Sequence, residues 1–193
     1  MEINQLMNRT TRFAVVLAML VAAPAHSAPL FGDASPLQDF LTLFRQQAIP
    51  RQRVLWRHGG ARGDIVISTS ARRLYYVLGD GTAIEYGVGV GRLGFSWSGV
   101  KQVSRKREWP DWTPPPQMLR RRPDLPRHMA GGIENPLGAR ALYLGSSLYR
   151  IHGSNEPDTI GAAVSSGCIR MTNDDVIDLY GRVKVGTKVT VVN

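Results

Sequence analysis

The chain has 193 residues, of which 43% are hydrophobic and 20% are charged, and this balance excludes a disordered or acidic solvating protein. Its net charge of +9 allows polyanionic partners such as nucleic acid, anionic lipid or an acidic cell-wall polymer. Cys168 is the single cysteine, which excludes a disulfide scaffold and any cysteine-rich zinc site. The length suits one domain of ordinary size together with an extension.

Residues 1–27 have the pattern of a secretory signal peptide. Arg9 and Arg12 precede an apolar run over 13–23, and small residues then predict cleavage after Ser27 or, alternatively, after Ala25. The run is shorter than the roughly 20 residues that a membrane-spanning helix needs. We therefore expect a protein that does not span the membrane after cleavage. The periplasm is its expected location, and export favours an envelope component over nucleic acid as the partner of its basic charge.

Residues 28–61 are interpreted as an N-terminal extension. Ser35 followed by Pro36 is typical of a helix start, because the hydroxyl can cap the first turn and proline fits its first position. Apolar residues at helical spacing then predict an amphipathic helix over 36–48, which Pro50 ends. The stretch 51–60 is interpreted as a basic linker.

Beyond residue 61 the pattern becomes that of a β-rich domain. Short apolar runs predict strands at 65–67, 74–78, 83–88, 142–144, 148–152 and 188–192. Asp80-Gly81 predicts a hairpin between the second and third of these strands. Thr172 with Asp175 three residues later predicts a capped short helix that ends near Gly181. The expected fold is mainly β, sandwich-like or barrel-like, with one or two short helices over 62–193.

Residues 92–136 are predicted to be irregular, and a loop this long in a compact domain is usually functional. Its tryptophans, Trp97, Trp109 and Trp112, favour local packing around the prolines or, alternatively, a platform for substrate. The run Arg120–Arg122 favours a solvated face or, alternatively, contact with acidic groups of a ligand.

The candidate chemistry lies in His152 and Cys168. A thiol is mostly protonated at neutral pH, so a nucleophilic cysteine needs a proton acceptor, usually histidine. His152 ends an apolar strand, and Cys168 follows in a loop of small residues, where the amides of Gly167 and Cys168 could face an oxyanion. The alternative is that the cysteine is a small buried hydrophobe and the histidine an ordinary hydrogen-bonded side chain.

His152-Gly153 and the run Ser165-Ser166-Gly167-Cys168-Ile169-Arg170 resemble the signature of the L,D-transpeptidase catalytic domain, or YkuD fold. The similarity extends to 64–90, to 135–144 and to 185–189, so that it covers about residues 62–193. It implies a β-sandwich or barrel-like catalytic domain.

The resemblance also implies a role for each matching residue. Cys168 resembles the acylated nucleophile, and His152 resembles the general base, oriented by a carbonyl at Gly153. The amides of Gly167 and Cys168 resemble the oxyanion hole, and Arg170 resembles a residue that braces the loop or meets the substrate. No metal or cofactor is implied.

The sequence departs from the family pattern at Ser166, where many members carry a second histidine, so no role for a second histidine is expected here.

The resemblance implies a transferase of peptidoglycan biosynthesis, with a role in building the cell wall and in cell shape. The cysteine thiolate attacks the diaminopimelate–D-Ala bond of a tetrapeptide stem, D-Ala leaves, and the thioester passes to an amine of a second stem to give a 3→3 cross-link. Water as acceptor gives an L,D-carboxypeptidase or endopeptidase instead, and an amine of an envelope protein gives protein anchoring. The alternative outside enzymes is a wall-binding scaffold.

Overall fold

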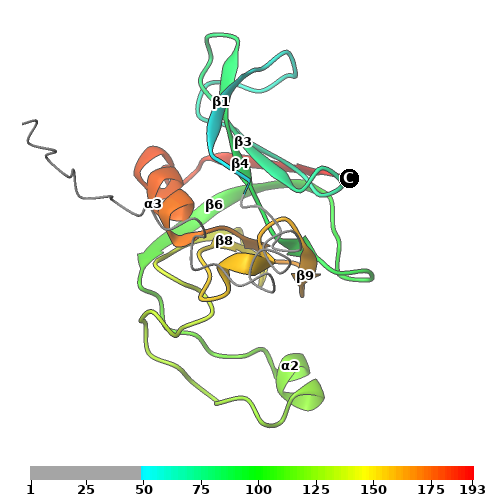
Figure 1. Ribbon diagram of the computed structural model, residues 1–193, viewed down its shortest axis with the longest axis vertical. Helices are drawn as coiled ribbons and strands as arrows, with labels where there is room; N and C mark the ends of the chain where they lie inside the picture. Colours follow the sequence, from blue (N-terminus) through cyan, green and yellow to red (C-terminus); the bar gives the residue numbers. More distant parts are fainter. Residues whose placement is uncertain (1–48) are drawn as a thin grey trace, which may run out of the picture. The chain divides into compact units, whose positions relative to one another are not determined.

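The computed structural model describes residues 49–193 (Figure 1). The predicted signal peptide over 1–27 and the predicted helix over 36–48 lie outside the described residues. Within 49–193 no helix is both long and apolar enough to cross a lipid bilayer.

Short strands make up most of the described chain, in agreement with the expected mainly β fold. The strands are β1 (Gln52–Leu55), β2 (Ile65–Ser68), β3 (Arg73–Val77), β4 (Thr82–Gly87), β5 (Val90–Gly91), β6 (Gly99–Glu108), β7 (Arg140–Leu144), β8 (Arg150–His152), β9 (Ala163–Ser165), β10 (Ile169–Arg170) and β11 (Lys188–Val192). The helices are α2 (Pro116–Arg121), the 3-10 helix η1 (Pro157–Thr159) and α3 (Asn173–Arg182).

One large sheet carries the fold, in the strand order β1-β4-β3-β2-β11-β6-β7-β8-β10. Its pairs are antiparallel except β2 with β11 and β8 with β10, and β5 and β9 form a separate parallel pair. Apolar side chains from both halves of this strand order meet in one core, which α3 also enters. Members of this core include Ile65, Leu74, Tyr86, Leu142, Ile151, Val176 and Leu179. The sheet therefore folds over a common interior, as expected of a sandwich-like domain, and each fully buried aliphatic side chain contributes about 1.5–3 kcal/mol.

The strands predicted from apolar runs are confirmed at β2, β3, β4, β7 and β11, and β3 and β4 form the expected antiparallel hairpin. The predicted helix cap is also confirmed, because the Thr172 side chain accepts a hydrogen bond from the Asp175 N–H. Helix α3 continues past Gly181 to Arg182. The strand predicted over 148–152 is shorter, since only 150–152 pair with β7.

Two strands lie where irregular structure was predicted. Strand β1 falls within the predicted linker and pairs antiparallel with β4, and Trp56 beyond it is buried. Strand β6 falls within the predicted loop and pairs with β11 along one half and with β7 along the other. Val103 is its one buried residue. The strand exposes most of its charged side chains, so its sequence lacks the apolar run on which the prediction relied.

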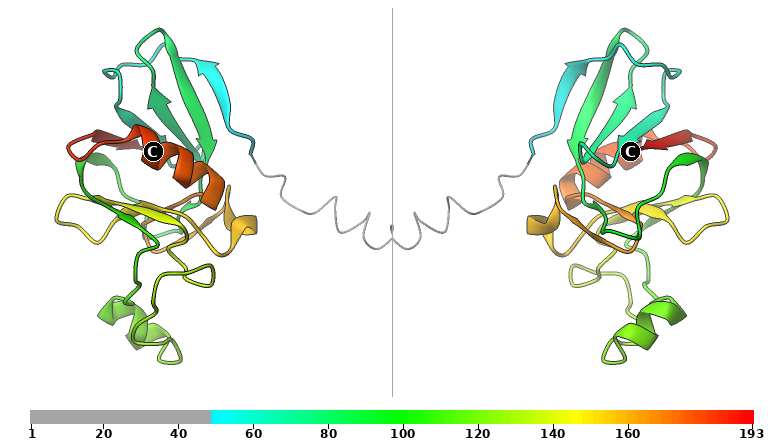
Figure 2. Two further views of the ribbon diagram at one scale, coloured as in Figure 1. Left: turned by 90° about the vertical axis from the view of Figure 1, so that its left-hand side faces the viewer. Right: turned by 90° about the vertical axis from the view of Figure 1, so that its right-hand side faces the viewer.

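The parallel pairing of β8 with β10 positions the site. It sets Ile151 opposite Ile169 and His152 opposite Arg170, and the Met171 N–H donates to the His152 carbonyl at 2.8 Å. Paired strands lie about 4.8 Å apart. The end of β8 and the loop entering β10 are therefore neighbours, although sixteen positions separate His152 from Cys168. The segment 109–138, with α2, extends away from the sheet on this side (Figures 1 and 2).

Candidate active site

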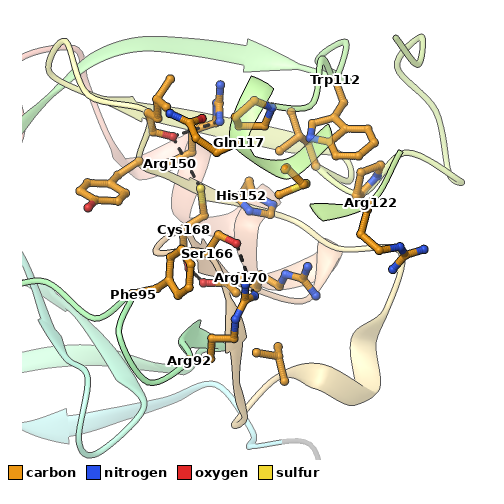
Figure 3. Close-up of a pocket in the computed structure, with 18 of the residues that line it drawn as sticks. Arg92, Phe95, Trp112, Gln117, Arg122, Arg150, His152, Ser166, Cys168 and Arg170 are labelled. Carbon is orange, nitrogen blue, oxygen red and sulfur yellow. Dashed lines mark hydrogen bonds between the residues drawn. The ribbon is translucent and has the colours of Figure 1, made fainter. Parts of the chain in front are cut away.

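A cavity of about 760 Å³ lies where β8, the loop before β10 and the long segment with α2 meet. His152 projects into it from the end of β8, and Cys168 from the loop before β10 (Figure 3). Ser166 and Arg170, two further predicted site residues, also line it. The structure thus brings four of the predicted site residues to one surface. The other two, Gly153 and Gly167, do not line the cavity but directly adjoin His152 and Cys168 in the chain.

His152 is held by the backbone next to it. Its side chain is buried, with 4% of the residue exposed, and Nδ1 lies 2.6 Å from the Gly153 carbonyl oxygen. A carbonyl oxygen can only accept a hydrogen bond, so Nδ1 carries the proton and Nε2 presents its lone pair. Burial lowers the pKa of His152 to about 3, and the nearby charges of Arg170 and Arg150 also disfavour protonation. The imidazole is therefore neutral at neutral pH.

The turn after His152 requires glycine for steric reasons. A Cβ at Gly153 would lie 2.2 Å from Asn173 Oδ1 and 3.1 Å from the Ala139 nitrogen. Asn173 opens α3, and its Oδ1 accepts a hydrogen bond from the Ala139 N–H at 2.9 Å. The first turn of α3 thus packs directly on the backbone that orients the imidazole, which is the physical reason for the His-Gly pair.

Cys168 is half-buried, and its resting form is a protonated thiol. Its Sγ donates to the Leu148 carbonyl oxygen at 3.7 Å, and Arg150 Nη1 donates to the same oxygen at 3.0 Å. Burial raises the pKa of the thiol, and the charges of Arg150 and Arg170 partly offset that rise. Within residues 49–193 the sulfur has no hydrogen bond with His152. The thiol hydrogen therefore faces the Leu148 carbonyl rather than the imidazole.

The loop that carries Cys168 is held by contacts with Ser165, Trp97 and Tyr149. Ser165 Oγ accepts from the Gly167 N–H at 3.1 Å and donates to the Cys168 carbonyl at 2.6 Å. Trp97 Nε1 donates to the Gly167 carbonyl at 2.7 Å, and its ring stacks on Tyr149 with centroids 4.6 Å apart. Gly167 has a φ of +104°, where a Cβ would lie 2.6 Å from Tyr149 Cε1.

These contacts distinguish the two amides predicted for the oxyanion hole. The N–H of Gly167 is already used by Ser165 Oγ. The N–H of Cys168 makes no hydrogen bond with any residue in the described part of the chain, so it is the amide available to a ligand. The contacts also correct the prediction for Trp97, which packs under the cysteine loop rather than around the prolines.

Arg170, on β10 just after the cysteine loop, contacts the segment around η1. Its Nη1 lies 2.8 Å from Glu156 Oε2 and donates to Thr159 Oγ1 at 3.5 Å. Ser166 Oγ accepts from Arg92 Nη1 at 3.4 Å. Arg150 is a site residue that the sequence reasoning missed. The signal was present, because residues two apart on a strand share a face and Arg150 precedes His152 by two positions.

The long segment forms one wall of the cavity and is rich in positive charge. Trp112, Met118 and Arg121 line it, whereas Trp109 and Arg120 do not. A substrate platform at Trp112 and contact of Arg121 or Arg122 with acidic ligand groups stay predictions, now limited to the members that line the cavity. Among the described residues, the charged side chains at the cavity are five arginines and one carboxylate: Arg92, Arg121, Arg122, Arg150, Arg170 and Glu156.

Comparisons with known proteins agree with one another. The YkuD family model, an L,D-transpeptidase catalytic domain, matches residues 62–191. The probable L,D-transpeptidase ErfK/SrfK of Escherichia coli is 40% identical over 157 residues, which are 77% of this chain and 49% of that protein. The chain thus spans about half the length of this relative. A relative from Fuscovulum blasticum, named as an L,D-transpeptidase in the ATP synthase subunits region, is 31% identical over 96% of this chain and 98% of its own.

Solved structures share the fold. An L,D-transpeptidase from Mycobacterium smegmatis superposes with a TM-score of 0.56 at 18% identity, covering 69% of this chain and 60% of the other.

Proposed function

Because this chain belongs to the L,D-transpeptidase catalytic domain family, we propose that it is a peptidoglycan L,D-transpeptidase in the cell envelope that uses Cys168 as its nucleophile. The single observation that carries the proposal is the pairing of β8 with β10, which brings a backbone-oriented neutral imidazole and the only thiol of the chain to one cavity. That arrangement suits acyl transfer through a covalent intermediate.

In the first half-reaction, Sγ of Cys168 attacks the diaminopimelate carbonyl carbon that is bonded to D-Ala. As the sulfur–carbon bond forms, the thiol proton passes to Nε2 of His152, the nitrogen whose lone pair is free. Collapse of the tetrahedral intermediate breaks the carbon–nitrogen bond. His152 returns the proton to the departing amine of D-Ala, and the stem remains as a thioester on the enzyme.

The charge that develops on the carbonyl oxygen needs a donor, and the Cys168 N–H is the candidate that the described hydrogen bonds leave available. Removing one such donor from an acyl-transfer site typically costs a factor of about 10²–10³ in rate. The Gly167 N–H supports the site indirectly, because its hydrogen bond to Ser165 Oγ fixes the loop. Arg170, in its pair with Glu156, is proposed as a brace for the same loop.

In the second half-reaction, an amine of a second stem attacks the thioester. His152 takes the proton of the amine, the new amide bond forms, and the thiolate of Cys168 leaves and is reprotonated. Water in place of the amine would release a tripeptide stem, and an amine of an envelope protein would give an anchored protein. The chemical identity of the product therefore shows which acceptor was used.

The test is intact-protein mass spectrometry of the chain and of its Cys168→Ala variant, each incubated with a carbapenem. We expect an adduct on the unchanged chain only. Tetrapeptide stems, with and without an amine acceptor, then separate cross-linking from hydrolysis. If the unchanged chain gives no adduct, and iodoacetamide labels Cys168 only after unfolding, the thiol is structural and a wall-binding scaffold replaces the enzyme.

A further inference from the structure

Two arginines at the cavity share one aromatic ring and lack a carboxylate partner. The guanidinium carbon of Arg92 lies 4.3 Å from the Phe95 ring centroid, and that of Arg121 lies 5.4 Å from the same centroid. Arg92 directly follows β5, whereas Arg121 ends α2, so the two reach the ring from separate elements. Within residues 49–193 neither forms a salt bridge.

The other arginines at the cavity are engaged. Arg122 is paired with Asp124 at 2.6 Å, and Arg170 with Glu156 at 2.8 Å. Arg150 donates to the Leu148 carbonyl. Arg150 also lacks a carboxylate, and its buried Nε has no hydrogen-bond partner among the described residues. Of the three cavity arginines without a carboxylate partner, Arg92 and Arg121 meet at Phe95. Two like charges at one ring repel each other, and an anion bound by both relieves the repulsion.

This pair lies next to the proposed nucleophile. Arg92 donates to Ser166 Oγ at 3.4 Å, and its backbone N–H donates to the Ser165 carbonyl at 3.0 Å. These contacts fix Arg92 to the loop that ends in Cys168, and Figure 3 places Phe95 and Arg92 on the Ser166 side of the sulfur. Arg121 belongs to the opposite wall, formed by the long segment. An anion held by both arginines would therefore lie beside the reacting carbonyl.

We infer that Arg92 and Arg121 form a carboxylate-binding site that reads a free carboxylate of the donor stem, an inference that rests on the proposed function. A guanidinium matches a carboxylate with two parallel N–H···O bonds, and such charge-assisted bonds are stronger than neutral ones. The donor stem offers this chemistry at two points, the free carboxylate of diaminopimelate and the terminal carboxylate of D-Ala. Both lie close to the bond that breaks.

The test measures binding in the Cys168→Ala protein, in which no turnover occurs. Calorimetric titration compares three tetrapeptides: the free acid, the same stem with an amide on diaminopimelate, and the same stem with an amide on D-Ala. We expect one of the two amides to bind about 10–100-fold more weakly than the acid, because it leaves the guanidinium pair without an anion. The position of the amide that weakens binding identifies the carboxylate that the two arginines bind.

Adding Arg121→Gln to Cys168→Ala should weaken binding of the acid by a similar factor and remove most of its advantage over the amide, since two changes to one interaction are not additive. Arg120→Gln is the matched control. It removes the same charge from the neighbouring exposed position of α2, outside the cavity, so the preference for the acid should persist. If the Arg120→Gln and Arg121→Gln variants bound the acid equally well, the proposed carboxylate site would be refuted. It would also be refuted if Arg121→Gln kept the full preference for the acid over the amide.

Carbapenem acylation of the unchanged chain separates this inference from the proposed function. An adduct together with stem binding that is insensitive to Arg121 refutes the carboxylate site alone. A Cys168→Ala protein that binds none of the three stems, with no adduct on the unchanged chain, refutes both.

Discussion

Acidification should destabilise this protein through His152 before its carboxylates are protonated. The folded protein keeps the imidazole neutral, with a pKa of about 3, because it is buried. The unfolded chain protonates the same group near pH 6.5. Between these values the unfolded state binds one more proton than the folded state, so stability falls as pH falls. From pH 6.5 to 4.5 this linkage removes about 2 kcal/mol from the free energy of unfolding.

Urea denaturation at half-unit steps from pH 7.5 to 4.5 measures this effect, with His152→Asn as the reference. Asparagine offers an amide N–H to the Gly153 carbonyl in place of Nδ1–H but does not titrate. The substitution itself changes the free energy of unfolding at every pH. The comparison therefore uses the slope of the free energy of unfolding against pH in each protein. The unchanged chain should lose about 1.4 kcal/mol more per pH unit than the variant below pH 6. Parallel slopes would show that folded His152 takes up the proton and would refute the argument from burial.

The same property predicts the pH dependence of acylation. A base that stays unprotonated to low pH keeps its lone pair available, so the rate of carbapenem acylation should stay level between pH 7 and 5. A tenfold fall per unit below pH 6.5, in stopped-flow or mass-spectrometric time courses, would show that His152 titrates as an ordinary exposed histidine.

The other predictions concern the nucleophile and its supports. Cys168→Ser should abolish adduct formation while circular dichroism and the melting temperature remain close to those of the unchanged chain; turnover that persists would refute the nucleophile. Gly153→Ala should lower the free energy of unfolding by about 1–3 kcal/mol, because its Cβ meets Asn173 Oδ1. Gly181→Ala, where a Cβ meets nothing within 4 Å in α3, should be neutral or stabilising in the same urea assay. Trp97→Phe removes an N–H donor to the cysteine loop, so it should cost about 1 kcal/mol and slow acylation; an unchanged acylation rate would show that the loop is held without it.

Features encoded by neighbouring residues could be predicted from the sequence. The cap at Thr172, the hairpin at Asp80-Gly81 and the buried strands β2 and β7 each depend on a short local pattern. The nucleophile and base candidates came from residue chemistry and from the family signature around Cys168, and the fold brings both to one cavity.

Features that depend on pairing between distant segments could not be predicted. Strand β6 shows little apolar alternation, because its place in the sheet comes from β7 and β11 rather than from its own side chains. The packing of Trp97 against Gly167 joins residues 70 positions apart. The meeting of Arg92 and Arg121 at Phe95 likewise depends on how the long segment folds back over the cysteine loop.

The carbonyl of Leu148 also bears on how the thiol withstands oxidants. Peroxides and disulfides react with thiolates far faster than with thiols. The chain has no second cysteine to trap a sulfenic acid as an internal disulfide, so oxidation of Cys168 would proceed toward irreversible products. A sulfur that rests protonated against a carbonyl keeps its thiolate fraction low. If Cys168 is the nucleophile, as proposed, this contact would protect the sulfur from oxidants between turnovers.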